Sequence, residues 1–373
     1  MKLTGALTGA LTGALTGALT GALTGKPAVE PHEDYGFFGP GSITWQVWSY
    51  PTSLTVGFQR AVVIEELDPA LIAAVDETQA IVYRPRTRYD RTLRYFALVA
   101  FGDSRSTSKA ADILVKVHSK GIGIEPLSGA KYDANDPDSQ LWIHLTAWHS
   151  ILYAYEKYGP GKLTPAEEAQ YWNECAIGAE LQTCSPDDVP RTREGIQSYF
   201  DHMRPRLVGS ETAQKMMAHL LNAEIMLPPV PRVFAPVNKI AAIVLRAGTI
   251  GTMPVWMREM SGLKQSRLVD GLITPILKVS FRVANSNAHA KVLLVGLLSP
   301  MTRPVVAPIL LGVPPTNPET LTPTEARARY GYDKPSEAHL ELRERQAQRV
   351  FGEHLAPSDE GIIESQAVLG NIA

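Results

Sequence analysis

Apolar residues recur with a helical period over most of the chain, and no stretch of convincing length alternates between apolar and polar residues as a strand does. In residues 59–78 the large apolar side chains fall on one helical face: Val62, Val63, Leu67, Leu71, Ile72 and Val75. Pro69 either begins a second helix within this stretch or kinks a single one. This periodicity predicts an all-α fold.

Residues typical of helix ends divide the rest of the chain into segments. Ser42 is placed to cap a helix that carries Trp45 and Trp48, and Thr164 is placed to cap one with Glu167 in its first turn. Further helices are predicted over residues 91–101, 106–117, 140–158, 192–203, 211–221, 238–247, 254–260, 268–284, 323–330 and 336–351.

The N-terminus is a low-complexity segment in which the unit Leu-Thr-Gly-Ala repeats five times from Leu3 to Ala22. Its glycines, at about 1 kcal/mol each, oppose an isolated helix in water. It could be a flexible arm, an amphipathic helix at an interface or a membrane span, and its Thr and Gly content favours the arm. We assign residues 1–34 to this arm and its linker, 35–315 to a single large helical domain, and 316–373 to a polar helical extension and tail.

Composition narrows the class of protein. The 373 residues are 45% hydrophobic and 20% charged, which is typical of a globular protein with a sizeable core. The formal net charge of −2 argues against nucleic acid as a partner, since phosphate binding needs a basic surplus. Cys175 and Cys184 are too few for a disulfide framework. We predict that they are reduced core thiols rather than a bridge, in keeping with a cytoplasmic protein.

Residues 292–311 are very apolar, but Arg303 and three prolines interrupt them, which disfavours a bilayer span. We expect either a buried core segment or a surface that rests on a membrane. The second alternative would make the protein membrane-associated through a peripheral contact.

Two stretches carry the side chains best suited to chemistry. Arg88-Tyr-Asp-Arg91-Thr92 places cations and a hydroxyl on one predicted helix, and Val115-Lys-Val-His118 places a lone imidazole in an apolar frame. A buried imidazole must hydrogen-bond or coordinate, because leaving its nitrogens unpaired costs a few kcal/mol. The simpler explanation for His118 is a core histidine whose nitrogens are hydrogen-bonded. The simpler explanation for the arginines is a helix face exposed to solvent. The alternative is metal ligation by His118 and anion binding by the arginines.

Other histidines and acids are weaker candidates. His144 and His149 are five residues apart, so they do not share one helix face as a zinc pair would. His144 has aromatic and aliphatic neighbours and is the better candidate for burial. Residues 132–138 are acidic but lack the glycine and the distal glutamate of a calcium loop, so a turn followed by a helix cap explains them more simply.

The order and spacing of several short motifs resemble one protein family over roughly residues 35–290. The motifs are Gly39-Pro-Gly-Ser-Ile-Thr-Trp45, Glu66-Leu-Asp-Pro69-Ala, Arg88-x-x-Arg91-Thr92, Val-Lys-Val-His118, Tyr132-x-Ala-x-Asp136-Pro137, Trp142-Ile-His144 and Met253-Pro254-Val-Trp-Met-Arg258. The chain is similar to the family of the rubber oxygenase (latex clearing protein) and the oxygenase of the mycophenolic acid pathway, in its uncharacterised actinobacterial branch.

The resemblance implies a globin-like helical core with extra helices that binds haem b. It implies that His118 is the axial iron ligand and that Arg88, Arg91 and Thr92 lie on the opposite side of the haem. Thr92 and His118 are 26 residues apart, which is enough for a helix, a turn and a second helix that face each other.

The chain departs from the family pattern at two positions. Arg91 stands where the rubber enzyme has lysine, so a distal amine ligand is not available. Asp68 stands where many relatives carry histidine, which puts any role of that position in doubt. His144, common in this branch, could be a second iron ligand, and six-coordinate iron would favour electron transfer or haem storage over oxygenation.

The first expectation is a haem-dependent oxygenase that acts with dioxygen on an apolar, unsaturated, isoprenoid-like substrate. In this hypothesis Arg91 and Thr92 stabilise negative charge that develops on the bound oxygen, and Arg88 anchors a propionate or steadies Arg91. Trp142 and Trp148 would line the substrate channel.

Two other functional classes stay open at the level of the sequence. One is a non-catalytic haem-binding or electron-transfer protein, ligated by His118 and His144. The other is an all-α structural or membrane-peripheral protein in which these histidines are core residues.

Overall fold

The computed structural model describes residues 29–78, 83, 85–223, 226–228 and 230–362. The predictions for the Leu-Thr-Gly-Ala repeat therefore lie outside the described residues. The division of the chain at residues 35 and 315 stays a prediction.

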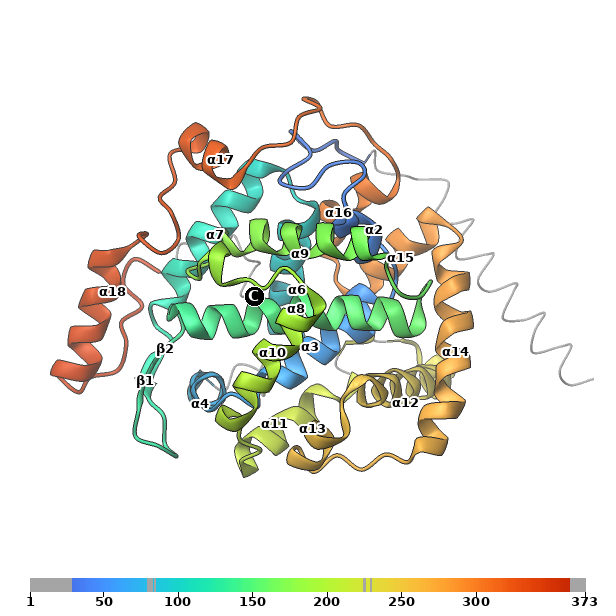
Figure 1. Cartoon of the computed structure of the whole chain (residues 1–373), viewed down its shortest axis with the longest axis horizontal. Coiled ribbons are helices and arrows are strands. Elements are labelled where there is room, and N and C mark those ends of the chain that lie inside the picture. Colours follow the sequence, from blue (N-terminus) through green and yellow to red (C-terminus); the bar gives the residue numbers. More distant parts are fainter. Residues whose placement is uncertain (1–28, 79–82, 84, 224–225, 229, 363–373) are drawn as a thin grey trace, which may run out of the picture.

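The regular secondary structure of the described residues is almost entirely helical, which confirms the all-α class (Figure 1). The first part of the chain forms α2 (Ile43–Trp48), η1 (Ser53–Gly57), α3 (Phe58–Glu65), α4 (Pro69–Thr78), α6 (Pro85–Phe101), α7 (Ser104–His118), α8 (Pro137–Tyr158), α9 (Pro165–Ala179), η2 (Pro186–Asp188) and α10 (Arg193–Met203). The second part forms η3 (Arg204–Arg206), α11 (Glu211–Leu220), η5 (Arg232–Phe234), α12 (Ala235–Thr252), α13 (Val255–Met260), α14 (Arg267–Asn285), α15 (Ala288–Leu298), α16 (Arg303–Leu310), α17 (Pro323–Tyr330), α18 (Leu340–Ala347) and η6 (Gln348–Gly352).

Side-chain caps set several helix boundaries where the sequence predicts them. The Ser42 hydroxyl accepts a hydrogen bond from the Trp45 amide at 3.2 Å and begins α2. Thr164 and Glu167 satisfy each other's backbone amides in a capping box at the start of α9, and Thr322 makes the same arrangement at α17. These caps satisfy amides that have no partner within their own helix.

The structure resolves the alternatives at Pro69, because this residue begins a separate helix, α4. It also contains a small hairpin that the sequence analysis missed: β1 (Ile122–Ile124) pairs antiparallel with β2 (Lys131–Asp133). Strands of three residues are too short to show a period of two. The acidic stretch that follows is a turn and a cap, as predicted, since the Asp136 carboxylate accepts from the Ser139 amide at 3.0 Å.

Helix α8 runs through the centre of the molecule and packs against α2, α3, α9 and α14 (Figure 1). Its aromatic residues join the main core, where the rings of Trp48 and Trp148 meet edge to face with centroids 5.2 Å apart. Cys175 and Cys184 are buried in the same core and are not bonded to each other, which confirms the prediction of reduced thiols.

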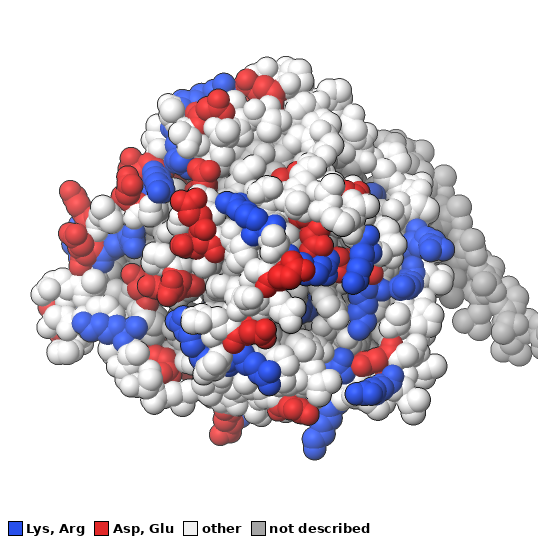
Figure 2. All heavy atoms as spheres, viewed as in Figure 1, with Lys and Arg blue, Asp and Glu red and all other residues white. Residues whose placement is uncertain are grey.

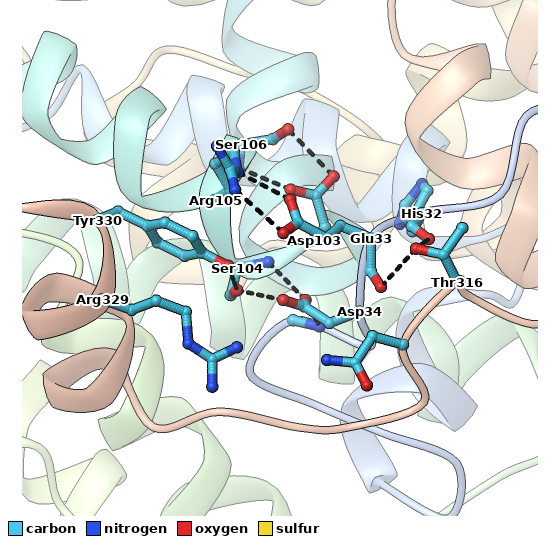
Figure 3. A network of polar contacts seen from close by, with 12 residues as sticks. His32, Glu33, Asp34, Asp103, Ser104, Arg105, Ser106, Thr316, Arg329 and Tyr330 are labelled. Atoms are coloured by element: carbon cyan, nitrogen blue, oxygen red, sulfur yellow. Dashed lines mark hydrogen bonds and ion pairs between the residues drawn. The ribbon is translucent and has the colours of Figure 1, made fainter.

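Segments far apart in the sequence are joined near one end of the molecule. The Thr316 amide donates to the His32 carbonyl at 2.9 Å, and the Leu321 amide donates to the Gly36 carbonyl at 3.0 Å. Figure 3 shows the polar network beside this pairing, in which the Asp34 carboxylate accepts from the amide and the hydroxyl of Ser104. Residues 316–321 are therefore tied to the start of the described chain.

The apolar stretch 292–311 forms α15 and α16. Five of its large apolar side chains are buried (Val292, Val295, Leu298, Val305 and Val306), five are partly buried, and Leu293 and Leu297 are exposed, so the stretch combines a core-facing side with an exposed one. Among the described helices, one from Arg232 to Thr252 is long and apolar enough to cross a membrane, by its length and composition.

Candidate functional site

Helices α6 and α7 pack together and bring Arg88 near His118. Arg91 and Thr92 follow Arg88 by three and four positions in α6, so the three share one side of that helix. The α7 helix is capped by Asp103 and ends at His118. The positive charge of Arg88 lowers the pKa of His118, so the two side chains lie within electrostatic range of each other.

The His118 imidazole is neutral at physiological pH. Burial first, and the charge of Arg88 second, lower its pKa to about 4. Its Nδ1 atom lies 3.4 Å from the Gln140 side-chain nitrogen, which also donates to the Ala134 carbonyl at 2.6 Å. Within the described residues no hydrogen-bond partner is found for the other ring nitrogen, Nε2.

Two carboxyl groups at the end of α3, Glu65 and Glu66, lie in the field of the same arginine. Burial raises the pKa of each to about 8, while the charge of Arg88 acts in the opposite direction. Glu65 Oε1 and Glu66 Oε2 are buried and have no hydrogen-bond partner among the described residues. Both groups are therefore largely protonated at neutral pH and can donate a proton.

The sequence analysis gave these acids no role, although a signal was present. Glu65 and Glu66 interrupt an apolar run between Val63 and Leu67. Adjacent acids at that position must either leave the core or be desolvated within it, and the structure shows the second outcome, because both are buried.

Asp68 has a structural function. Its carboxylate accepts a hydrogen bond from the Leu71 amide at 2.9 Å and so caps the first turn of α4. Burial raises its pKa, and the hydrogen bonds from the Leu71 and Ala70 amides partly offset this. An acid at this position is thus explained by the helix that follows it.

His144 does not join His118. Its Nε2 atom lies 2.7 Å from the Cys175 carbonyl oxygen, and its Nδ1 atom lies 3.4 Å from the Gln182 side-chain nitrogen. Burial lowers its pKa to about 4. Residues of α9 and of the loop after it thus engage both ring nitrogens, and the role of His144 as a second iron ligand stays a prediction.

His149 is less buried than His144, as expected. Its Nδ1 atom lies 3.4 Å from Arg60, and its ring centroid lies 4.8 Å from that of Phe200. It is therefore part of a separate contact between α8 and α10.

The expectation that Trp142 and Trp148 line a substrate channel is wrong. Their exposed fractions are 1% and 0%, so neither offers surface to a channel. Trp142 packs on Phe200 and donates to the Glu65 carbonyl at 3.3 Å, and Trp148 packs on Tyr171. Both are core residues.

The arginine run on α6 divides by function. Arg86 donates to the Leu227 carbonyl at 2.8 Å and to the Leu297 carbonyl at 3.3 Å, so it connects α6 to α15 and to the loop at residue 227. Arg88 faces the acids and the imidazole described above. Arg84 lies outside the described residues.

The surroundings of His118 fit a ligand to haem iron. A neutral imidazole with an unengaged Nε2 is the form that coordinates a metal. His118 and Arg88 are both partly buried, and loss of solvent is the largest cause of the lowered pKa of each. In the described part of the chain no three His, Cys, Asp or Glu side chains come together to hold a metal ion by themselves.

Comparison with known proteins gives one result. Residues 45–285 match the family model described as "ER-bound oxygenase mpaB/B'/Rubber oxygenase, catalytic domain". No curated protein and no solved structure matches the chain. The globin-like arrangement of the core therefore stays a prediction.

Proposed function

The chain belongs to the family of the ER-bound oxygenase mpaB/B' and rubber oxygenase catalytic domains, and from this premise we propose that it is a haem-dependent oxygenase. The proposed substrates are dioxygen and an apolar, unsaturated compound of isoprenoid type, since the family includes a rubber oxygenase. The observation that carries the proposal is the position of Arg88 near a neutral, partly buried His118.

His118 would hold the haem, with Arg88, Arg91 and Thr92 as the polar side chains on the neighbouring helix. A bound haem supplies the site at which dioxygen is activated. Ligation through Nε2 of His118 requires a proton on Nδ1. Gln140 must then turn its amide oxygen toward the ring and give up its hydrogen bond to Ala134.

Arg88 would supply positive charge to the site rather than bind a propionate. Desolvation lowers the pKa of Arg88 below the usual range of an arginine, and the two carboxyl groups near it act in the opposite direction. Because Arg88 already faces Glu65 and Glu66, we prefer its role in positioning Arg91 over anchorage of a propionate. Arg91 and the Thr92 hydroxyl would donate hydrogen bonds where negative charge develops on the oxidant.

Glu65 and Glu66 would store a proton close to the reacting atoms. Each has a pKa of about 8, so a small change in the charge of its surroundings can release the proton at physiological pH. A carboxylic acid in a desolvated site can donate a proton and take it back without the help of water.

The two other classes have less support. A bis-histidine haem protein needs His144 as a ligand, and that ring is held by Cys175 and Gln182. A purely structural protein is at odds with a family model that describes a catalytic domain. Neither is carried by an observation of its own.

Haem reconstitution tests the proposal. We expect the purified protein to bind one haem with a Soret band, and His118→Ala to weaken binding by more than about tenfold, since the axial ligand is lost. His289→Ala, at an exposed histidine, is the matched control and should bind as the wild type does. His144→Ala should leave the Soret position unchanged.

The reduced protein should also bind carbon monoxide, which indicates an open coordination position. A His118→Ala variant with an unchanged Soret band and an unchanged affinity for haem would refute the assignment of the ligand. Haem binding without dioxygen consumption in the presence of unsaturated hydrocarbons would refute the assignment of the reaction.

A further inference from the structure

Helices α12 and α14 are in contact, and α12 runs toward α14 at one edge of the molecule (Figure 1). Both helices expose rows of large aliphatic residues. We call these residues, with the two before α12, the α12–α14 face: Val233, Phe234, Val237, Ile240, Ile243, Leu268, Leu272, Ile276, Val279 and Val283. The five on α14 fall at helical spacing on one side, opposite the buried Leu277 and Phe281. Leu268 is 80% exposed and Leu272 is 69% exposed, so nothing in the described chain covers them.

The same region carries a strong excess of positive charge. Residues 231–312 contain ten Lys and Arg but two Asp and Glu, whereas the rest of the chain contains 26 and 36. One of the two acids, Asp270, is paired with Arg258 at 2.9 Å. Lys278 and Arg282 are exposed on α14 directly beside the aliphatic row, and blue side chains line this edge of the molecule in Figure 2.

Helix α12 lies on the body of the protein and is not free to cross a bilayer. Only 28% of the most apolar 18-residue stretch of this helix is buried. Its C-terminal residues 247–252 are nevertheless buried in the core. The Tyr158 hydroxyl donates to the Gly248 carbonyl at 2.8 Å, and the Thr249 hydroxyl donates to Gln59 at 2.6 Å. A transmembrane position would break these buried contacts, whereas a position along a membrane surface keeps them.

We propose that the α12–α14 face rests on the surface of an anionic lipid bilayer. Aliphatic side chains would enter the acyl boundary while the flanking cations meet lipid phosphates and carboxylates. A second copy of the chain is a poorer occupant, because a symmetric contact would bring two positive surfaces together. Residues 1–28 contain Lys2 and Lys26 and no acid, so they do not complement the charge either.

Vesicle flotation with the full chain tests this surface. We expect binding to phosphatidylcholine vesicles that contain about 30 mol% phosphatidylserine, and much weaker binding at about 0.5 M salt than at about 0.05 M. Each cation near such a surface strengthens binding by about fivefold, so K278Q/R282Q should weaken partitioning roughly 25-fold. Leu272→Ser should also reduce it, with no loss of fold because the side chain is exposed.

Matched controls lie on other surfaces. Leu127→Ser changes a leucine that is 60% exposed at the β1–β2 hairpin, and Lys162→Gln removes an exposed cation; both should bind as the wild type does. Far-ultraviolet circular dichroism checks the fold of each variant. Equal binding to neutral and anionic vesicles, or no binding to either, would overturn the proposal. A dimer in light scattering that Leu272→Ser dissociates would assign this face to a second copy instead.

Discussion

At the scale of single residues, desolvation determines the protonation states of the groups at the candidate site. Glu65 and Glu66 keep their protons to about pH 8, and His118 gives up its proton above about pH 4, because burial disfavours the charged form in each case. Arg88 remains the cation among them. Arg88 and His118 could be selected from the sequence by residue type and spacing. The interrupted apolar run marks Glu65 and Glu66, but their role could not be predicted because it depends on the charge of Arg88 in α6.

Glu66→Gln tests the cost of this burial. The pKa of Glu66 is raised in the folded state, so its contribution to stability is fully present below about pH 4.5 and is lost as the pH rises through 8. The glutamine variant mimics the protonated acid at every pH. We expect nearly equal free energies of unfolding at pH 4, and a variant that is more stable by about 5 kcal/mol at pH 9.

Urea unfolding at the two pH values measures this difference. Glu259→Gln, at an exposed acid, should show no such dependence on pH. A Glu66→Gln variant that differs from the wild type by the same amount at both values would contradict the raised pKa.

At the scale of elements, the short helix α2 depends on an acid from another helix. The Glu174 carboxylate of α9 accepts hydrogen bonds from the Thr44 amide and hydroxyl at 2.6 Å each, and from the Ile43 amide at 3.2 Å. A negative charge at a helix N-terminus is favourable, and bonds to a charged acceptor are stronger than those to a neutral one. The position of α2, and with it Trp45 and Trp48, is thus set from α9.

Glu174→Gln should loosen this junction. The amide removes the charge and turns one acceptor into a donor that faces other donors, so we expect a loss of about 1–3 kcal/mol in the free energy of unfolding. Glu194→Gln, at an exposed acid in the first turn of α10, should change it by less than about 0.5 kcal/mol. Tryptophan fluorescence during urea unfolding measures both, and equal effects would argue against a special role of Glu174.

Helices with strong caps could be predicted closely, and others could not. The boundaries at Ser42, Thr164 and Thr322 follow from local chemistry that the sequence displays. Helix α6 begins at Pro85 rather than near Arg91, because its arginine-rich first turns show no apolar period. The β1–β2 hairpin escaped prediction since its strands are three residues long.

At the scale of the whole molecule, charge is separated along the chain. Residues 231–312 are strongly basic and the remainder is acidic, so a net charge of −2 conceals two opposite surpluses. The overall composition therefore could not indicate an attractive surface for anions. Long-range pairing, such as that between residues 32–36 and 316–321, was equally beyond prediction because neither segment has a periodic pattern.

Chemical labelling of the two buried cysteines can measure how often the core of the protein opens. Burial raises the pKa of Cys184 to about 12 and that of Cys175 well above its usual value, so neither forms a reactive thiolate in the closed protein. A disulfide reagent should modify both thiols at once in urea and only slowly in buffer. The slow rate in buffer would then measure how often the aromatic core opens spontaneously. Modification in buffer as fast as that of free cysteine would show that the reagent reaches the thiols without such opening.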